Sequence, residues 1–311
     1  MTKTLTQSQL LDAAQLLRDG KLVAFPTETV YGLGADATND LAVAAIFEAK
    51  NRPSFNPLIV HLPDVAAAEA FVTFTDEART LADAFWPGPM SLVLPLRGDA
   101  GLSDLVTAGL NTVAIRVPAH PLAQALLREV GLPIAAPSAN PSGKISPTTA
   151  AHVLDGLSGR IAAVVDGGQC GVGLESSIFG GDPITLLRPG GISREAAEGA
   201  LGRALAQGGG LAKPNAPGQL ASHYAPDAGI RLNVEAKQDV AHLGFGTGTA
   251  DLNLSPTGNL TEAAANLFSM LRKMDALTQA AGADHFTVAP IPQHGLGLAI
   301  NDRLTRAAAP R

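Results

Sequence analysis

The sequence predicts an α/β fold in two domains. Segments with the apolar spacing of amphipathic helices alternate with short aliphatic and β-branched runs, a pattern typical of helices layered on a sheet. Turn-forming residues, 33 Gly and 22 Pro, separate these segments. A stretch of low periodicity, rich in Gly, Pro and Ala, follows the last of them. We therefore expect a twisted mixed-sheet domain over residues 1–207, a linker or lid over 208–229, and a small domain over 230–311.

In the first domain, the opening helix has signals at both ends. Thr6 and Gln9 have the spacing of a capping box, and Gly20 is a residue type that commonly ends a helix. The apolar run LVAF that follows is typical of a buried strand. By the same criteria, we expect helices at 7–19, 40–50, 75–85, 120–130 and 193–207, and strands at 22–25, 91–96, 112–117, 133–137, 162–167 and 184–189.

The C-terminal segment repeats the pattern on a smaller scale. A strand is expected at 230–234, followed by the glycine-rich stretch 244–249 and a long helix. A further strand at 286–292 and a helix at 298–308 end the chain, so we expect a small Rossmann-like α/β domain. The apolar stripe of the long helix consists of Leu267, Met270, Leu271, Met274 and Leu277.

Composition excludes several classes of protein. No uncharged run reaches the roughly 18 residues of a membrane span, and the first 20 residues lack the apolar core of a secretory signal. One cysteine among 311 residues excludes a disulfide scaffold and a cysteine-based metal cluster. A net charge of −6 is unlike that of a protein that grips nucleic acid by charge. We expect a cytoplasmic protein.

Three motif-like features carry little weight. GLGADA at 32–37 matches a dinucleotide-binding fingerprint, but proline and polar residues precede it where the strand should lead into the turn. PSGKIS at 141–146 lacks the first glycine of a phosphate-binding loop. Cys170 lies in a glycine-rich stretch and is more typical of an incidental thiol than of a nucleophile.

Polar and cationic residues cluster where the predicted strands end. FPTETVYG places Thr27, Glu28 and Thr29 after the first buried strand, where α/β proteins commonly bind ligands. Pro53 favours extended geometry at Arg52, so Lys50 and Arg52 are expected on one side, suited to a polyphosphate or a carboxylate. Two solvated surface charges after a helix are the alternative interpretation.

Arg116 strengthens the functional interpretation. In the strand TVAIRV, Val113, Ile115 and Val117 share one face, which leaves Arg116 on the other face, where a buried guanidinium requires an anion. PSAN, ESS and RPGG add hydroxyl groups, an amide and Arg188 next to other strands. No nucleophile–base pair and no metal cage accompany these donors. The pattern therefore favours phosphoryl or nucleotidyl transfer catalysed by positioning and electrostatics.

These motifs, in this order, resemble those of the threonylcarbamoyl-AMP synthases. The resemblance rests on FPTETVYGLG, K-x-R-P followed by NPL, WPGP, PSAN with SPT, ESS and RPGG. PGQLASHYAP resembles the family's interdomain linker, and NLFSMLRKMD and GLGLAINDRLTRAA resemble the C-terminal domain of its two-domain branch. The resemblance covers nearly the whole chain and implies that residues 1–207 are the catalytic domain.

The resemblance implies a reaction and its participants. ATP, L-threonine and bicarbonate would form L-threonylcarbamoyladenylate, a nucleotidyl transfer that releases pyrophosphate, with Mg²⁺ carried by ATP and no metal ligands from the protein. Downstream transferase proteins would then modify the adenosine beside the anticodon of tRNAs that read ANN codons. A weak RNA contact is possible in this scheme, and no membrane contact is expected.

The resemblance also implies roles for individual residues. Lys50 and Arg52 would act at the phosphates as the catalytic cations. For Tyr224 we expect a lid over the adenine or the triphosphate, with anchoring of the second domain as the alternative; for Thr112 the alternative is sheet-edge pairing, and for Ser146 a helix N-cap. The ATP site would consist of Arg52, Asn56, Thr112, Ser138, Ser146, Arg188 and Tyr224, and the L-threonine site of Thr29, His61, Arg116, Ala136 and Ser176.

Two other functions belong to the same fold. One is a carbamoyl-adenylate-forming module, which normally sits in a much larger chain with further segments that this sequence lacks. The other is a non-catalytic protein that binds double-stranded RNA, against which the net charge of −6 argues. The sequence therefore favours the synthase.

Overall fold

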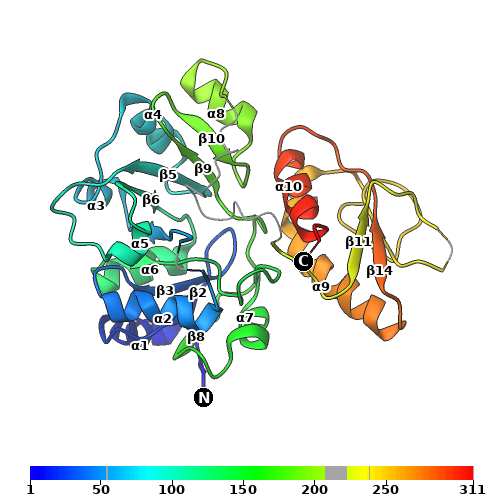
Figure 1. Cartoon of the computed structure of the whole chain (residues 1–311), viewed down its shortest axis with the longest axis horizontal. Coiled ribbons are helices and arrows are strands. Elements are labelled where there is room, and N and C mark those ends of the chain that lie inside the picture. Colours follow the sequence, from blue (N-terminus) through cyan, green and yellow to red (C-terminus); the bar gives the residue numbers. More distant parts are fainter. Residues whose placement is uncertain (54, 207–222, 238, 311) are drawn as a thin grey trace.

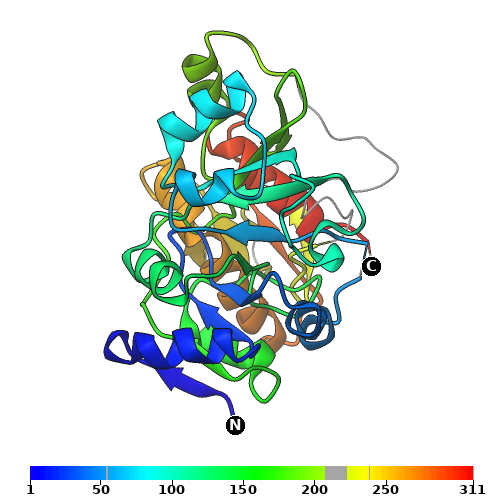
Figure 2. The same ribbon diagram turned by 90° about the vertical axis from the view of Figure 1, so that its left-hand side faces the viewer.

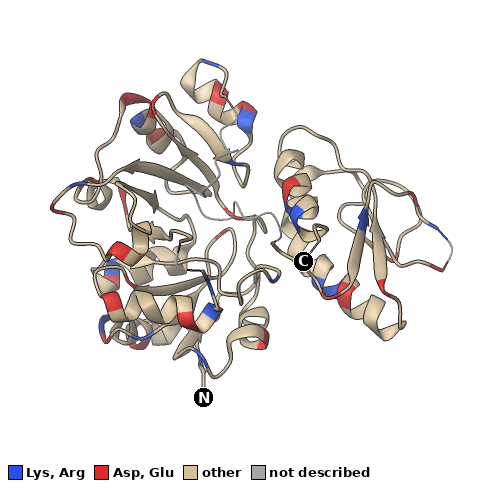
Figure 3. Ribbon diagram, viewed as in Figure 1, with Lys and Arg blue, Asp and Glu red and all other residues tan. Residues whose placement is uncertain are grey.

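The structure, a computed structural model, describes residues 1–53, 55–206, 223–237 and 239–310. Figure 1 shows two α/β bodies side by side, the larger from the N-terminal part of the chain and the smaller from the C-terminal part. Seen from the side of the larger body, the smaller one lies behind it (Figure 2). Both bodies carry interspersed acidic and basic residues (Figure 3). In the described ranges, no helix is long and apolar enough to cross a membrane.

The larger domain is built on one mixed sheet of ten strands among the described residues. The sheet contains both parallel pairs, such as β4 (Ile59–His61) with β6 (Thr112–Arg116), and antiparallel pairs, such as β5 (Met90–Pro95) with β6, as predicted for a mixed sheet. The spatial order is β1 (Lys3–Leu5), β8 (Ala163–Val165), β2 (Val23–Phe25), β3 (Gly32–Asp36), β7 (Ile134–Ala135), β4 (Ile59–His61), β6 (Thr112–Arg116), β5 (Met90–Pro95), β9 (Ser177–Gly180) and β10 (Thr185–Arg188).

Helices cover the two faces of this sheet unequally. One face packs on α2 (Asp40–Lys50), α4 (Asp76–Phe85), α5 (Asp104–Thr107), α7 (Ala150–Leu157) and α8 (Arg194–Leu201) in the main apolar core. Helices α1 (Leu10–Arg18) and α6 (Pro121–Val130) cover the opposite face near β2 and β8. Farther along that second face, over β4, β6 and β9, only a small apolar cluster is found among the described residues: Ile59, Ala114 and Ile178, with Val93 and Leu187 against it. The helices are η1 (Gln7–Gln9), α1 (Leu10–Arg18), α2 (Asp40–Lys50), α3 (Val65–Glu69), α4 (Asp76–Phe85), α5 (Asp104–Thr107), α6 (Pro121–Val130), α7 (Ala150–Leu157) and α8 (Arg194–Leu201).

Most of the predicted elements of this domain are confirmed. The capping box of Thr6 and Gln9 is present, although the first turn is a 3₁₀ helix, and Gly20 follows the helix with a φ of 71°. The helix predicted at 193–207 is too long, because Gly202 adopts a left-handed conformation and ends α8 at Leu201. GLGADA is no nucleotide loop: Gly32–Asp36 is strand β3, antiparallel to β2.

The smaller domain has four parallel strands within its described part. In its long helix, the predicted stripe is wrong at Leu277, which is 46% exposed, whereas Phe268 is buried. The buried face of this helix also includes Ala263, Ala264 and Thr278, because the helix packs on both its own sheet and the larger domain. The spatial order is β11 (Gly229–Leu232), β14 (His285–Val288), β12 (His242–Gly244) and β13 (Leu252–Asn253), with helices α9 (Leu260–Ala280) and α10 (Gly297–Ala307).

The two domains share an apolar core. Val30, Ile145 and Leu174 of the larger domain pack in the same buried cluster as Phe268 and other residues of the smaller domain. Figure 1 shows α9 and α10 on the side of the smaller domain that faces the larger one. Burying apolar area at this joint stabilises one arrangement of the domains. Residues 208–222 of the predicted linker, 208–229, lie outside the described part of the chain. The boundaries of the linker therefore stay a prediction.

The RPGG turn lies directly against the ESS segment. A Cβ atom on Gly190 would come within 2.4 Å of the backbone oxygen of Glu175 and of backbone atoms of Ser176 and Ser177. Gly191 donates its N–H to the carbonyl of Glu175 at 3.1 Å. Only glycine therefore allows the two segments to approach this closely.

We predict opposite effects for alanine at two glycines. Gly190→Ala should lower the free energy of unfolding by about 2 kcal/mol or more, because backbone atoms cannot move aside cheaply. Gly199→Ala, the control, should raise it by about 0.5–1 kcal/mol, because this helical glycine has open space around it. Urea unfolding of both variants measures the difference, and equal effects would contradict the close approach.

Candidate active site

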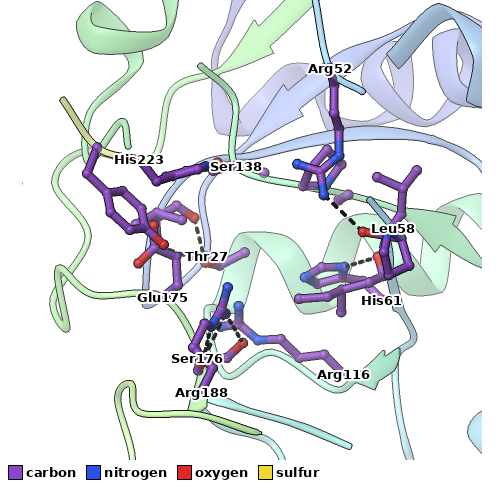
Figure 4. Close-up of a pocket in the computed structure, with 17 residues that line it drawn as sticks. Thr27, Arg52, Leu58, His61, Arg116, Ser138, Glu175, Ser176, Arg188 and His223 are labelled. Carbon is purple, nitrogen blue, oxygen red and sulfur yellow. Dashed lines mark hydrogen bonds between the residues drawn. The ribbon is translucent and has the colours of Figure 1, made fainter. Parts of the chain in front are cut away.

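A cavity lies where strand ends of the larger domain meet the chain that leads into the smaller domain. Its volume is about 50 Å³, room for a few water molecules. Figure 4 shows Arg116 and Arg188 near Ser176 on one side, and Arg52 and His61 on another. The lining residues are Thr27, Val30, Gly32, Arg52, Pro57, Leu58, Ile59, His61, Arg116, Ala136, Pro137, Ser138, Glu175, Ser176, Arg188, His223 and Tyr224.

Sheet register explains why distant residues meet here. His61 at the end of β4 is paired with Arg116 at the end of β6, and Arg116 with Ser91 on β5. Ser176 directly precedes β9, which runs parallel to β5, so the cavity collects both starts and ends of strands. Polar residues thus meet at strand ends, as predicted, but the mixed sheet also places the start of β9 at the cavity.

Arg116 is held by Glu28. Its Nη2 donates to Glu28 Oε1 at 2.7 Å, and Glu28 Oε2 accepts the N–H of Ala119 at 3.1 Å. The guanidinium is only 4% exposed, and its Nε is buried without a hydrogen-bond partner. A buried guanidinium with an unused donor is suited to bind a carboxylate. Val113 and Ile115 lie in the main core, which confirms the predicted two faces of this strand.

Ser176 and Arg188 form a second polar group. Arg188 donates from Nη2 and Nε to the carbonyl of Ser176, at 2.8 and 3.2 Å. The hydroxyl of Ser176 lies 2.8 Å from that of Ser91. Burial lowers the pKa of Arg188 to about 10, so this side chain stays cationic at neutral pH. The wall therefore presents a fixed positive charge next to a hydroxyl group.

His61 is neutral at physiological pH. Burial, and next the charge of Arg116, lower its pKa to about 3. Its Nδ1 lies 3.2 Å from the carbonyl of Ile59, and its ring meets that of Phe25 edge-on at 6.1 Å. The imidazole therefore offers hydrogen bonds without adding positive charge.

Arg52 and Asn56 belong to one loop. Arg52 donates from Nε to the carbonyl of Asn56 at 3.2 Å and from Nη2 to that of Pro57 at 2.9 Å. Burial lowers the pKa of Arg52 to about 10. Both amide atoms of Asn56 are buried without a partner, although its side chain is outside the cavity wall. Such orphaned polar atoms are rare and suggest a ligand contact.

Lys50 lies elsewhere than predicted. It is the last residue of α2, and Asn51 turns left-handed with a φ of 51°, so the extended geometry expected for Lys50 and Arg52 is wrong. Its Nζ donates to the carbonyl of Ser138 at 2.5 Å and to that of Asn140. Burial, and next Arg52, hold the pKa of this ammonium well below its usual range. Lys50 fixes the PSAN loop and lies outside the cavity wall.

Several other predicted residues lie behind the wall. Thr112 begins β6 and Arg116 ends it, about 13 Å apart along the strand. Ser146 donates to Glu175 Oε1 at 2.5 Å, and the N-cap of α7 is Thr149, so the alternative role of Ser146 as a cap is wrong. The hydroxyl group of the predicted Thr29 contacts that of Thr27, and it is Thr27 that lines the cavity.

Ala136 lines the cavity with its N–H already used, because that group donates to the carbonyl of Ile59 at 2.9 Å. The carbonyl of Ala136 is therefore the backbone group to consider for a ligand. Ser138, also predicted, lines the cavity as expected.

The predicted site lacks Glu175 and His223 as wall residues and Glu28 as the partner of Arg116. Thr27, which the sequence placed after the first buried strand without a specific role, also lines the cavity. Burial alone would raise the pKa of Glu175, but Arg303, Arg188 and Ser146 outweigh it and lower the pKa to about 2. Glu175 adjoins the predicted Ser176, and that adjacency was the available signal. The role of Arg303, which is 128 residues away in the chain, left no signal in the sequence.

Tyr224 contacts both the shared core and the cavity. Its ring stacks on Phe268 at 5.4 Å in the shared core and also lines the cavity, next to His223. Burial raises the pKa of its phenol to about 12, so the group is a neutral donor. The anchoring role is thus visible in its contacts, and closure as a lid stays a prediction, because residues 207–222 lie outside the described part.

Cys170 does not have the properties of a nucleophile. It is buried, and burial raises the pKa of its thiol to about 12. Among the described residues, no group of three His, Cys, Asp or Glu side chains is placed to hold a metal ion.

The pKa of His61 predicts how stability depends on pH. The unfolded chain takes up a proton near the ordinary pKa of 6.5, and the folded chain only near pH 3. Stability should therefore fall as the pH is lowered from about 6.5 towards 3, and Glu175 adds to the loss below about pH 4.5. In His61→Gln, the slope of unfolding free energy against pH between 6 and 4 should shrink by up to about 1.4 kcal/mol per pH unit. Urea unfolding at several pH values measures it, and an unchanged slope would contradict the buried neutral imidazole.

Comparison with known proteins identifies the family. A family model described as telomere recombination matches residues 15–190, and one described as threonylcarbamoyl-AMP synthase, C-terminal domain, matches 192–309. The chain is 45% identical to a threonylcarbamoyl-AMP synthase of Bacillus subtilis, over 97% of this chain and 94% of that protein. For one of Pyrococcus abyssi the identity is 41%, over 96% and 94%. The crystal structure of P. abyssi Sua5 complexed with L-threonine matches with a TM-score of 0.88 at 38% identity, covering 99% of this chain and 97% of that one. The chain therefore belongs to the threonylcarbamoyl-AMP synthase family.

Proposed function

We propose that this protein joins L-threonine, bicarbonate and ATP into L-threonylcarbamoyladenylate and releases pyrophosphate. The observation that carries the proposal is a cavity walled by Arg52, Arg116 and Arg188, in a chain whose family makes this product. Three guanidinium groups in one small cavity suit a carboxylate and a polyphosphate bound next to each other.

The chemistry needs positioning more than proton transfer. Threonine's neutral amine attacks the carbon of CO₂, formed from bicarbonate, and loses a proton to give a carbamate. A carbamate oxygen then attacks the α-phosphorus of ATP, and the bond to the β-phosphate breaks as pyrophosphate leaves. Carbamate and mixed anhydride are both labile in water, so a cavity that excludes water protects them. Holding the two reactants in line supplies much of the rate.

The threonine side of the cavity is formed by Arg116, His61 and Ser176. Arg116 binds the carboxylate with the edge that Glu28 leaves unused, and the neutral His61 adds hydrogen bonds without repelling the amine. Ser176 offers its hydroxyl group, and Ala136 its carbonyl. Thr29 acts through its contact with Thr27.

The ATP side is formed by Arg52, Ser138 and Arg188, with Tyr224 across from them. Asn56 contributes an amide that has no protein partner. Lys50, Ser146 and Thr112 contribute to ATP binding from behind this wall, Lys50 by fixing the PSAN loop. His223 and Tyr224 line the cavity beside these groups, so bound ATP would contact both side chains.

Mg²⁺ enters with ATP in this proposal. The donors of the wall are guanidinium, hydroxyl and amide groups, which suit phosphate oxygens rather than a cation. The carboxylate in the wall, Glu175, already accepts from Ser146 and Arg303. The residues present therefore fit a metal ion carried by the triphosphate. Bound there, Mg²⁺ would neutralise charge on the leaving pyrophosphate.

The product would be passed to transferase proteins that modify the adenosine beside the anticodon of tRNAs reading ANN codons. We place this step in the cytoplasm, which the single cysteine supports. The interspersed charges of Figure 3 and the net charge of −6 support at most a weak contact with RNA. Family matches that together run from 15 to 309 support the synthase over a carbamoyl-adenylate module.

The direct test is incubation of the pure protein with ATP, radiolabelled bicarbonate and each amino acid in turn. We expect a labelled adenylate and pyrophosphate with threonine. Product with every amino acid, or with none, would contradict the proposal.

Arg116→Lys should separate the two substrates. Lysine keeps the charge but loses the planar fork that binds a carboxylate through two N–H groups. The dissociation constant for threonine should rise at least tenfold, about 1.4 kcal/mol, with little change for ATP. Calorimetric titration of each substrate measures both, with Arg97→Lys, an exposed arginine just beyond the end of β5, as the control. Equal losses for both substrates would indicate a folding role instead.

Substrate choice gives a further prediction. A pocket that hydrogen-bonds the threonine hydroxyl leaves buried polar groups unpaired when valine binds. Valine should therefore react at least about 100-fold less efficiently, and serine, which lacks only a methyl group, about tenfold less. Competition between labelled amino acids measures kcat/KM ratios. Similar values for valine and threonine would show that the cavity does not read the hydroxyl group.

A further inference from the structure

A cation of the smaller domain is buried behind the wall of the larger domain's cavity. Arg303 on α10 is 0% exposed, and its Nε donates to Glu175 Oε2 at 2.8 Å. Its guanidinium carbon lies 5.3 Å from the centre of the Tyr224 ring. Asp302 accepts from Nη1 at 2.6 Å, and Nη2 is buried without a hydrogen-bond partner. Arg303 thus contacts two wall residues without being part of the wall.

Glu175 connects Arg303 to residues on both sides of the cavity. Its other carboxylate oxygen accepts the hydroxyl of Ser146 at 2.5 Å, on the proposed ATP side. Its backbone carbonyl accepts the N–H of Gly191, and the next residue, Ser176, belongs to the proposed threonine side. The orientation of one carboxylate therefore affects both halves of the site.

Burial makes the pair interdependent. Removing one member of a buried ion pair leaves an uncompensated charge, which the structure must rearrange to solvate. Around Glu175 that rearrangement would move Ser146, Ser176 and the Tyr224 ring. An exposed ion pair has no such effect, because water replaces the lost partner.

We propose that Arg303 is a positioning residue, through which the smaller domain holds Glu175 and so the substrate-binding side chains in place. The proposal rests on the function proposed above and extends it to the C-terminal domain. It assigns that domain a part in binding both ATP and threonine, although the wall contacts come mainly from the larger domain.

A double-mutant cycle on the pair tests this. Arg303→Met and Glu175→Gln should each raise KM for both ATP and threonine at least tenfold, with kcat changed less than threefold. The variant that carries both Arg303→Met and Glu175→Gln should have KM values no higher than those of the more impaired single variant, because both substitutions break the same interaction. KM values that rise additively, or for neither substrate, would overturn the proposal.

The control is a second ion pair between the same parts of the chain. Lys144 and Asp227 meet at 2.6 Å, but their side chains are 50% and 64% exposed. Lys144→Gln should leave both KM values unchanged. If Arg303→Met does not fold, Arg303→Lys replaces it, because lysine keeps the charge. This variant should give a smaller rise in both KM values. Wild-type KM values in both a folded Arg303→Lys and Glu175→Gln would overturn the proposal.

Hydrogen exchange separates this proposal from the proposed function. The amide of Gly191 is bonded to Glu175, and that of Ser177 to Pro89, so both report on the ESS segment. Both amides should exchange at least tenfold faster in Arg303→Met and Glu175→Gln than in the wild type or Lys144→Gln. Unchanged exchange would overturn the positioning role. Faster exchange in a protein whose wild type makes no adenylate would instead overturn only the proposed function.

Discussion

The structure depends on the removal of cationic side chains from water. Lys50, Arg116, Arg188 and Arg303 are each at most 5% exposed, and an unpaired buried charge costs several kcal/mol. Each is therefore matched locally: Lys50 and Arg188 by backbone carbonyls, Arg116 and Arg303 by carboxylates. These pairings determine where the PSAN, ESS and RPGG segments can lie, and hence the shape of the cavity between them.

The same constraint explains the chemistry. Guanidinium groups that are already held by carbonyls and carboxylates need no reorganisation when an anion arrives, which is the condition for electrostatic catalysis. The neutral His61 and the inert Cys170 fit this picture, because neither competes as a base or a nucleophile. In the proposed reaction, bound substrates that fill the cavity would also keep water from the labile carbamate and anhydride.

The smaller domain contributes to the site through packing as well as charge. Val30 lines the cavity and Leu174 directly precedes the wall residue Glu175, and both are buried in the core shared with the smaller domain. The second face of the large sheet near β4 and β6 carries little apolar cover of its own among the described residues. The cavity therefore depends on packing from both domains.

The sequence by itself determined the elements and the chemistry. Helix caps, strand periodicity and the polar face of Arg116 are local patterns, and they sufficed for the α/β class and the two-domain architecture. Together with the family resemblance, they gave eight of the 17 residues that line the cavity. Tertiary structure alone decided which residues pair: Lys50 with the PSAN carbonyls, Arg116 with Glu28, and Arg303 with Glu175 across 128 positions. It also placed Thr112 away from Arg116 along the same strand. The physical reason is that periodicity depends on neighbours in the chain, whereas the partner of a buried charge depends on which groups folding brings within a few ångströms.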